Sequence, residues 1–227
     1  MKLKKIASLM LAGIMAVSML AGCNGSPVNE DPNSEPTTTA GHSATLEENL
    51  GKEVTDKKYV SFQDNAQDEA ALRQALNNLN TTAALNNSVG KNLECIHDYA
   101  LNGFPELIAD FTDGAEFTDA DLKIGDLAMT WYASNNFINR NVKDGTVFVI
   151  DGAVGVDEAV KKVADEVEQY LANLPEHNDN TNNNNDRYDY SYVVSVSVVN
   201  KAVDVVDWSN ASANFIAVTV TRTATVD

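Results

Sequence analysis

The clearest pattern in the chain is a helical repeat of apolar residues between Val156 and Leu174. Charged residues fill the positions between them, so one side of the segment is apolar and the other is charged. This spacing predicts an amphipathic helix that ends just before Pro175, because proline cannot continue a helix. The apolar stripe comprises Val156, Val160, Val163, Val167, Tyr170, Leu171 and Leu174.

Two long segments near the carboxyl end alternate between apolar and polar residues, which is the period of a β-strand. Over 188–199, tyrosines and valines alternate mainly with serines, and over 215–226 isoleucine, valine and alanine alternate with threonines. The alternation predicts two long antiparallel strands. One face of these strands, rich in Ser and Thr, either stays wet or forms a partner surface.

Shorter patterns predict the remaining elements. The apolar, β-rich run at 146–150 indicates a strand that is covered on both faces. A short strand is expected at 59–62, and Asp64 or Asn65 is suited to cap the helix that follows it. Further helices are predicted at 93–101, from Pro105 to Phe111, and from Thr118 as its N-cap to Phe137.

These elements indicate an α+β fold, in which amino-terminal helices pack on a three- or four-stranded, mostly antiparallel sheet. We place this single globular domain at residues 59–227. The preceding residues 24–44 contain three of the five prolines and almost no apolar side chains, so they cannot bury enough surface to offset their ordering entropy. Residues 23–58 are therefore predicted to form a flexible tether, although the weakly amphipathic part from Leu46 to Lys58 remains undecided.

The first 22 residues have the layout of an export signal, with three lysines ahead of an uncharged, mostly apolar run. The sequence Leu20-Ala21-Gly22-Cys23 that ends this region resembles the lipobox of bacterial lipoproteins. The resemblance implies that residues 1–22 form a signal peptide and that Cys23 carries a diacylglyceryl group. We therefore expect a membrane anchor on the extracytoplasmic face, since two acyl chains hold a protein stably in a bilayer. The alternative is an ordinary secretory signal that leaves Cys23 unmodified.

The charge and composition exclude several classes of function. The chain has 16 basic and 33 acidic residues, and its net charge of -17 repels nucleic acids. Two cysteines and three histidines do not suffice for a disulfide scaffold or a Cys/His zinc cluster. With Cys23 lipidated, Cys95 has no disulfide partner in the chain, and we interpret it as a small buried apolar residue.

Three common catalytic or phosphate-binding motifs are missing from the sequence: it contains no G-x-S-x-G, no H-E-x-x-H and no Gly-rich phosphate loop. Cys95 and His97 have the residue types of a nucleophile and base, but on the predicted helix two such positions point away from each other. His42 falls in the predicted tether and His177 in an Asn-rich loop, which removes both from any rigid site.

Two groups of residues remain as candidates for ligand binding. The acidic stretch between Glu106 and Asp126 leaves calcium as an alternative to the expectation of no cofactor. Lys123 stands where the third ligand of an EF-hand loop belongs, which favours helix capping and solubility instead. The second group is a tyrosine row that either belongs to the core or stacks against sugar rings. The candidates are Asp113, Glu116, Asp119 and Asp121 for calcium, and Tyr188, Tyr190 and Tyr192 for a ligand.

We therefore expect a lipid-anchored, non-catalytic binding domain whose partner is an extracellular protein, peptide or glycan. One alternative is an extracellular hydrolase that uses a pair of carboxylates, although 33 acids offer too many pairs to choose among. The other alternative is a structural envelope protein that assembles through an edge strand ending at Val226.

Overall fold

The computed structural model describes residues 41–79, 92–96, 104–118, 129–134, 137–178, 187–202 and 212–226. The signal region with its lipobox and Cys23 lies outside these residues, as do His97, Asp119 and Asp121.

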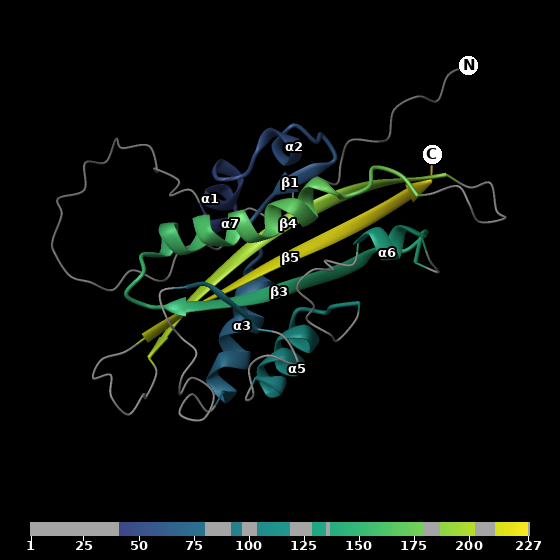
Figure 1. Ribbon diagram of the computed structural model, residues 1–227. Coiled ribbons are helices and arrows are strands. Elements are labelled where there is room, and N and C mark those ends of the chain that lie inside the picture. The colour runs from purple at the N-terminus through teal and green to yellow at the C-terminus, as the bar shows by residue number, and fades with distance from the viewer. Residues whose placement is uncertain are drawn as a thin grey trace, which may run out of the picture. The chain divides into compact units, whose positions relative to one another are not determined.

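A mixed sheet of five strands forms the middle of the fold, in the order β1-β4-β5-β3-β2 (Figure 1). β1 runs parallel to β4, whereas the other three pairings are antiparallel. The α+β class is therefore confirmed, although the sheet has more strands than the three or four expected. The strands are β1 (Val60–Phe62), β2 (Glu94–Ile96), β3 (Val142–Asp151), β4 (Tyr188–Ala202) and β5 (Ser212–Val226).

The two long strands pair as the alternation predicts. β4 and β5 are antiparallel along their full length, from Tyr188 opposite Val226 to Ala202 opposite Ser212. β3 pairs with the other side of β5. β5 is therefore an interior strand over residues 213–222, whereas residues 223–226, which include the Val226 end of the envelope-protein alternative, have no partner on β3.

Helices cover both sides of the sheet, which makes three layers (Figure 1). One helical layer contributes to the larger core cluster together with β3, β4 and β5, and the other contributes to a second cluster on the opposite sheet face. The first layer consists of α1 (His42–Glu48), α2 (Lys52–Thr55), α6 (Met129–Ser134) and α7 (Val156–Ala172), and the second of α3 (Ala66–Asn78) and α5 (Pro105–Gly114).

β3 shows why a helical layer is needed on each face of the sheet. Its residues Phe148 and Ile150 belong to the core on the α7 side, whereas Val147 and Val149 belong to the core on the α3 and α5 side. All four side chains are buried. The prediction of a strand covered on both faces is confirmed.

The folded domain begins earlier than the predicted boundary at Tyr59. α1 and α2 lie in the last part of the predicted tether, and Leu46 and Val54 are fully buried there. The backbone N–H of Gly51 donates to Glu168 Oε1 of α7 at 2.6 Å, 117 residues away. Residues 46, 50 and 54 form a short helical stripe whose packing partner is remote in the sequence, so local composition does not reveal that the segment folds.

One of the predicted helices differs from the structure, and another lies mostly outside the described residues. Residues 94–96, expected within a helix, form β2, because their backbone pairs with β3 with Cys95 opposite Phe148. Residues 119–128 of the helix predicted to begin at Thr118 lie outside the described residues, whereas Thr118 itself is described. Its hydroxyl accepts the N–H of Lys143 at 2.8 Å, so it extends the edge of β3. The described helix of that region is α6, which ends before Phe137.

Three different segments occupy the outer edge of β4. The N–H of Tyr190 donates to the carbonyl of Glu176 at 2.8 Å, and the N–H of Tyr192 to the carbonyl of Tyr59 at 2.7 Å. The N–H of Val196 donates to the hydroxyl of Ser43 at 2.9 Å. β1 alone is only three residues long, and the other two segments extend the protection of this edge over residues 190–196.

Candidate functional site

The predicted calcium ligands are only partly described. Asp113 lies in the last turn of α5 and Glu116 follows the helix, and both are exposed. Glu116 has a φ of 59°, in the left-handed region that non-glycine residues adopt rarely. Within the described ranges, no three His, Cys, Asp or Glu side chains come close enough together to hold a metal ion.

Cys95 lies on an edge strand and contacts only structural partners. Its Sγ is 3.3 Å from Thr146 Oγ1 and 3.5 Å from the carbonyl oxygen of Val147. Burial raises the pKa of the Cys95 thiol to about 12. Because the thiolate is the nucleophilic form, this cysteine is unreactive at neutral pH.

Polar contacts hold both ring nitrogens of His177, although the sequence places this residue in an Asn-rich loop. Its Nδ1 lies 2.7 Å from Asp189 Oδ1, and its Nε2 lies 2.9 Å from Arg187 Nη2. Residue 177 also forms a β-bridge with residue 189. No described nucleophile adjoins the ring, so the arrangement fixes the base of the loop and does not form a catalytic pair.

The buried carboxylate of Asp68 is engaged on both oxygens. Asp68 is fully buried in the first turn of α3, and Oδ1 forms an ion pair with Lys143 on β3. Oδ2 accepts a hydrogen bond from Thr219 Oγ1 at 2.6 Å. A glycosidase needs a second acid across a water-accessible gap. Asp68 faces a lysine instead, so it fastens α3 to the sheet.

The tyrosine row lies on one face of β4, as the alternation predicts, but it points into the core. Tyr190 and Tyr192 are buried, and their hydroxyls donate to the carbonyls of Ile138 at 3.0 Å and Pro175 at 2.8 Å. Burial raises the pKa of Tyr192. Tyr59 packs beside Tyr192 with the ring centroids 6.2 Å apart. A sugar would reach the ring faces of Tyr190 or Tyr192 only if this packing opened.

Arg222 completes this group of aromatic residues. It lies opposite Tyr192 in the β4–β5 pairing, is fully buried, and places its guanidinium carbon 4.2 Å from the ring centroid of Tyr190. Nη2 donates to the carbonyls of Phe137 at 2.6 Å and Arg140 at 3.1 Å. We call Tyr59, Tyr190, Tyr192 and Arg222 the tyrosine–arginine cluster.

The sequence contains a signal for the burial of Arg222. It occupies an inward position of the alternating strand, in line with Val218 and Val220, where only apolar residues are expected. A charge at such a position indicates a buried polar interaction. Burial lowers the pKa of Arg222, but an arginine remains charged at neutral pH.

The opposite sheet face is only half covered. Ser195, Ser197 and Thr219 are buried on it. Further along the same strands the side chains reach solvent. Val193 is 38 % exposed and lies opposite Thr221, and Ser191 lies opposite Thr223. We call this uncovered part the open sheet face, and it consists of Ser61, Ser191, Val193, Thr221 and Thr223.

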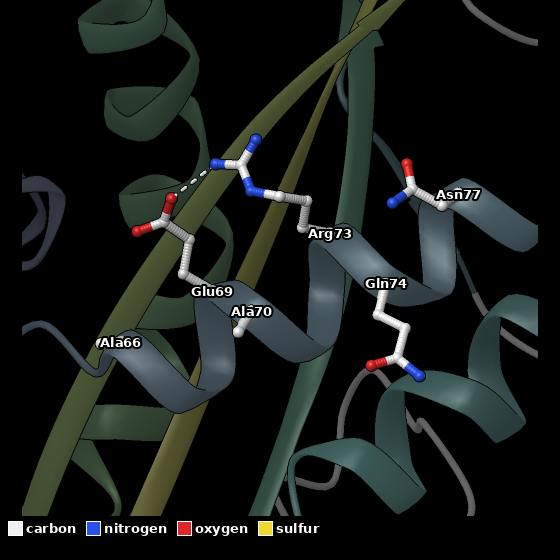
Figure 2. A pocket seen from close by; sticks show the side chains of 6 residues that line it. All are labelled: Ala66, Glu69, Ala70, Arg73, Gln74 and Asn77. Atoms are coloured by element: carbon white, nitrogen blue, oxygen red, sulfur yellow. Dashed lines mark hydrogen bonds and ion pairs between the residues drawn. The ribbon is translucent and has the colours of Figure 1, made fainter. Parts of the chain in front are cut away.

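A shallow hollow of about 460 Å³ lies on the exposed side of α3. Figure 2 shows Glu69 and Arg73 extending to one side of the helix, where they form an ion pair of 2.7 Å, and Gln74 pointing to the other. Both ion-pair side chains are about half exposed, and such surface pairs contribute little. The hollow has no buried titratable group among its described lining residues, which are Ala66, Glu69, Ala70, Arg73, Gln74 and Asn77.

In the part of the chain that the structure describes, no helix combines the length and the apolar character needed to cross a membrane. No protein-family model, curated protein or solved structure matches this chain.

Proposed function

We propose that this protein is a lipid-anchored, extracytoplasmic binding domain without catalytic activity, and that it holds its partner at the open sheet face. The anchor rests on the lipobox that ends at Cys23. The single observation that carries the binding role is the partial cover of one sheet face, which leaves Val193 exposed.

The chemistry of the open sheet face supports a protein partner. Its five side chains are uncharged, although the whole chain carries a net charge of -17. Depletion of charge is the compositional mark of the centre of a protein interface. Sugar recognition typically uses an exposed aromatic ring, and the buried tyrosines of β4 lie on the other sheet face. We therefore favour a protein or peptide over a glycan.

Buried side chains on the opposite face hold the strands that carry the open sheet face in place. Tyr192 and Arg222 lie on the same strands as Val193 and Thr221, with their side chains directed to the other face and buried there. A preorganised surface loses little entropy when it binds, so even a small face can support a useful affinity.

The anchor is tested by mass spectrometry of the protein recovered from its native host. We expect the amino-terminal residue to be Cys23 with a diacylglyceryl group, and the variant Cys23→Ser to leave the membrane fraction. An unmodified thiol in the wild-type protein would contradict the anchor.

The binding surface is tested by placing a photo-crosslinking amino acid at position 193 on intact host cells. Lys161, exposed on α7 on the other side of the sheet, is the matched control position. We expect a discrete protein adduct from position 193 that disappears when Thr223→Lys is added, and no such adduct from position 161. Equal crosslinking from both positions, or an adduct indifferent to Thr223→Lys, would refute the site.

A further inference from the structure

We infer that Arg222 binds a monatomic anion, which is chloride under physiological conditions, within the tyrosine–arginine cluster. The inference is independent of the lipid anchor and of the open sheet face.

The first argument is the uncompensated charge of Arg222. Its side chain is fully buried, and its described hydrogen bonds go to two neutral carbonyls, those of Phe137 and Arg140. Asp144 lies on the same sheet face along β3, but its Oδ1 accepts the N–H of Gly145 at 2.8 Å, and no described ion pair joins it to Arg222. A buried cation without a counter-charge is strongly destabilising, so the site favours an anion.

The second argument is the pair of guanidinium nitrogens that stay unused. Among the described residues, Nε and Nη1 of Arg222 have no hydrogen-bond partner although both are buried. The hydroxyls of Tyr190 and Tyr192 donate to the carbonyls of Ile138 and Pro175, and neither oxygen accepts a hydrogen bond from Nε or Nη1. Buried N–H groups are almost always satisfied, so these two nitrogens indicate a ligand.

The geometry of the occupied nitrogen selects the kind of anion. A guanidinium offers two forks to a bidentate anion, and both of them include Nη2. Because Nη2 already donates to two carbonyls, neither fork is complete. A carboxylate or phosphate therefore loses its bidentate advantage, whereas a spherical ion accepts single bonds from Nε or Nη1. The N–H bonds of a guanidinium lie in its plane, so the ion must lie near that plane.

The test compares thermal unfolding of the full chain in sodium chloride and in sodium gluconate at equal ionic strength. Gluconate binds through a carboxylate, which finds no complete fork on Arg222, so it reports general salt effects. We expect chloride to raise the unfolding temperature by a few degrees in a saturable manner. Arg222→Met should lose this chloride-specific rise, whereas Arg73→Met, which removes an exposed arginine on α3, should keep it.

Identical responses of the wild-type protein to the two salts would overturn the inference, and so would a saturable chloride effect that survives in Arg222→Met. A second measurement covers the case in which Arg222→Met does not fold. Wild-type crystals soaked in sodium bromide should show an anomalous peak within hydrogen-bond distance of Arg222 Nε or Nη1. A map without a peak at that place would equally overturn it.

Discussion

Asp68, in the first turn of α3, forms an ion pair with Lys143 of β3, 75 residues later in the chain. Thr219 of β5 donates to the same carboxylate, so one side chain joins α3 to two strands. This junction fixes α3 over one part of the sheet. It therefore helps to determine where the covered part of that face ends and the open sheet face begins.

Replacing Asp68 by alanine should strongly destabilise the protein. The substitution leaves the Lys143 ammonium, whose side chain is 14 % exposed, without its partner. We expect the free energy of unfolding to fall by about 3–5 kcal/mol, as measured by urea denaturation. The matched control is Glu69→Ala one residue later, which breaks the half-exposed pair with Arg73 and should cost below about 1 kcal/mol. Similar losses in both variants would contradict this role of Asp68.

Gly145→Ala should destabilise the sheet through a backbone clash. A Cβ at this position would lie 2.5 Å from the carbonyl oxygen of Val218 and 3.1 Å from the Cα of Thr219, neither of which can rotate away. We expect a loss of about 1–3 kcal/mol in unfolding free energy. Gly155→Ala, where a Cβ meets nothing within 4 Å, is the control and should lose less. The unfolding midpoint should be lower for Gly145→Ala than for Gly155→Ala, and the reverse order would contradict the clash.

Tyr192→Phe should cost about 1–2 kcal/mol, because it leaves the carbonyl of Pro175 without the hydroxyl that donates to it. Tyr188→Phe removes a hydroxyl from the half-buried end of the same row and should cost less. Both variants keep the aromatic ring, so calorimetry isolates the hydroxyl. A larger loss in Tyr188→Phe would argue against the cluster as the support of this end of the sheet.

The stability of the protein should fall as the pH rises from 9 to 12, in part because of Cys95. Burial raises the pKa of the folded-state thiol from 9.0 to about 12, so the unfolded chain loses this proton first. Loss of a proton from the unfolded state alone favours unfolding. Cys95→Ala should therefore show a shallower decline in unfolding free energy over this range. Parallel declines in the two proteins would show that the thiol does not contribute.

The sequence predicted those elements whose pattern repeats over many residues. The stripe from Val156 to Leu171 became α7, and the alternation from Tyr188 onward became β4 with its predicted partner β5. Asn65 caps α3 as expected, since its side chain accepts the N–H of Gln67 at 2.9 Å. For α7, β4 and β5, the local sequence contains enough repeats to decide between a helical and a strand period.

The remaining features depend on contacts between distant parts of the chain. β2 is three residues long, too short for alternation to distinguish it from a helix. α1 and α2 pack against α7, which lies more than 100 residues later in the chain. Arg222 stands out in the sequence as a charge in an apolar row, but the carbonyls that it binds are 85 and 82 residues away. The open sheet face was one of two predicted outcomes, and the positions of α3 and α5 help to decide how much of that face is covered.

If the proposed lipid anchor holds the protein at a bilayer, the divided protection of the β4 edge affects how neighbouring molecules can associate. Molecules that share one bilayer surface meet far more often than they do in free solution, and neighbouring sheets then tend to join through unpaired strands. Here a loop carbonyl, a short parallel strand and a serine hydroxyl each occupy a different N–H of β4. A neighbour that paired with residues 190–196 of β4 would have to displace three separate segments, which opposes the joining of sheets along this part of the edge.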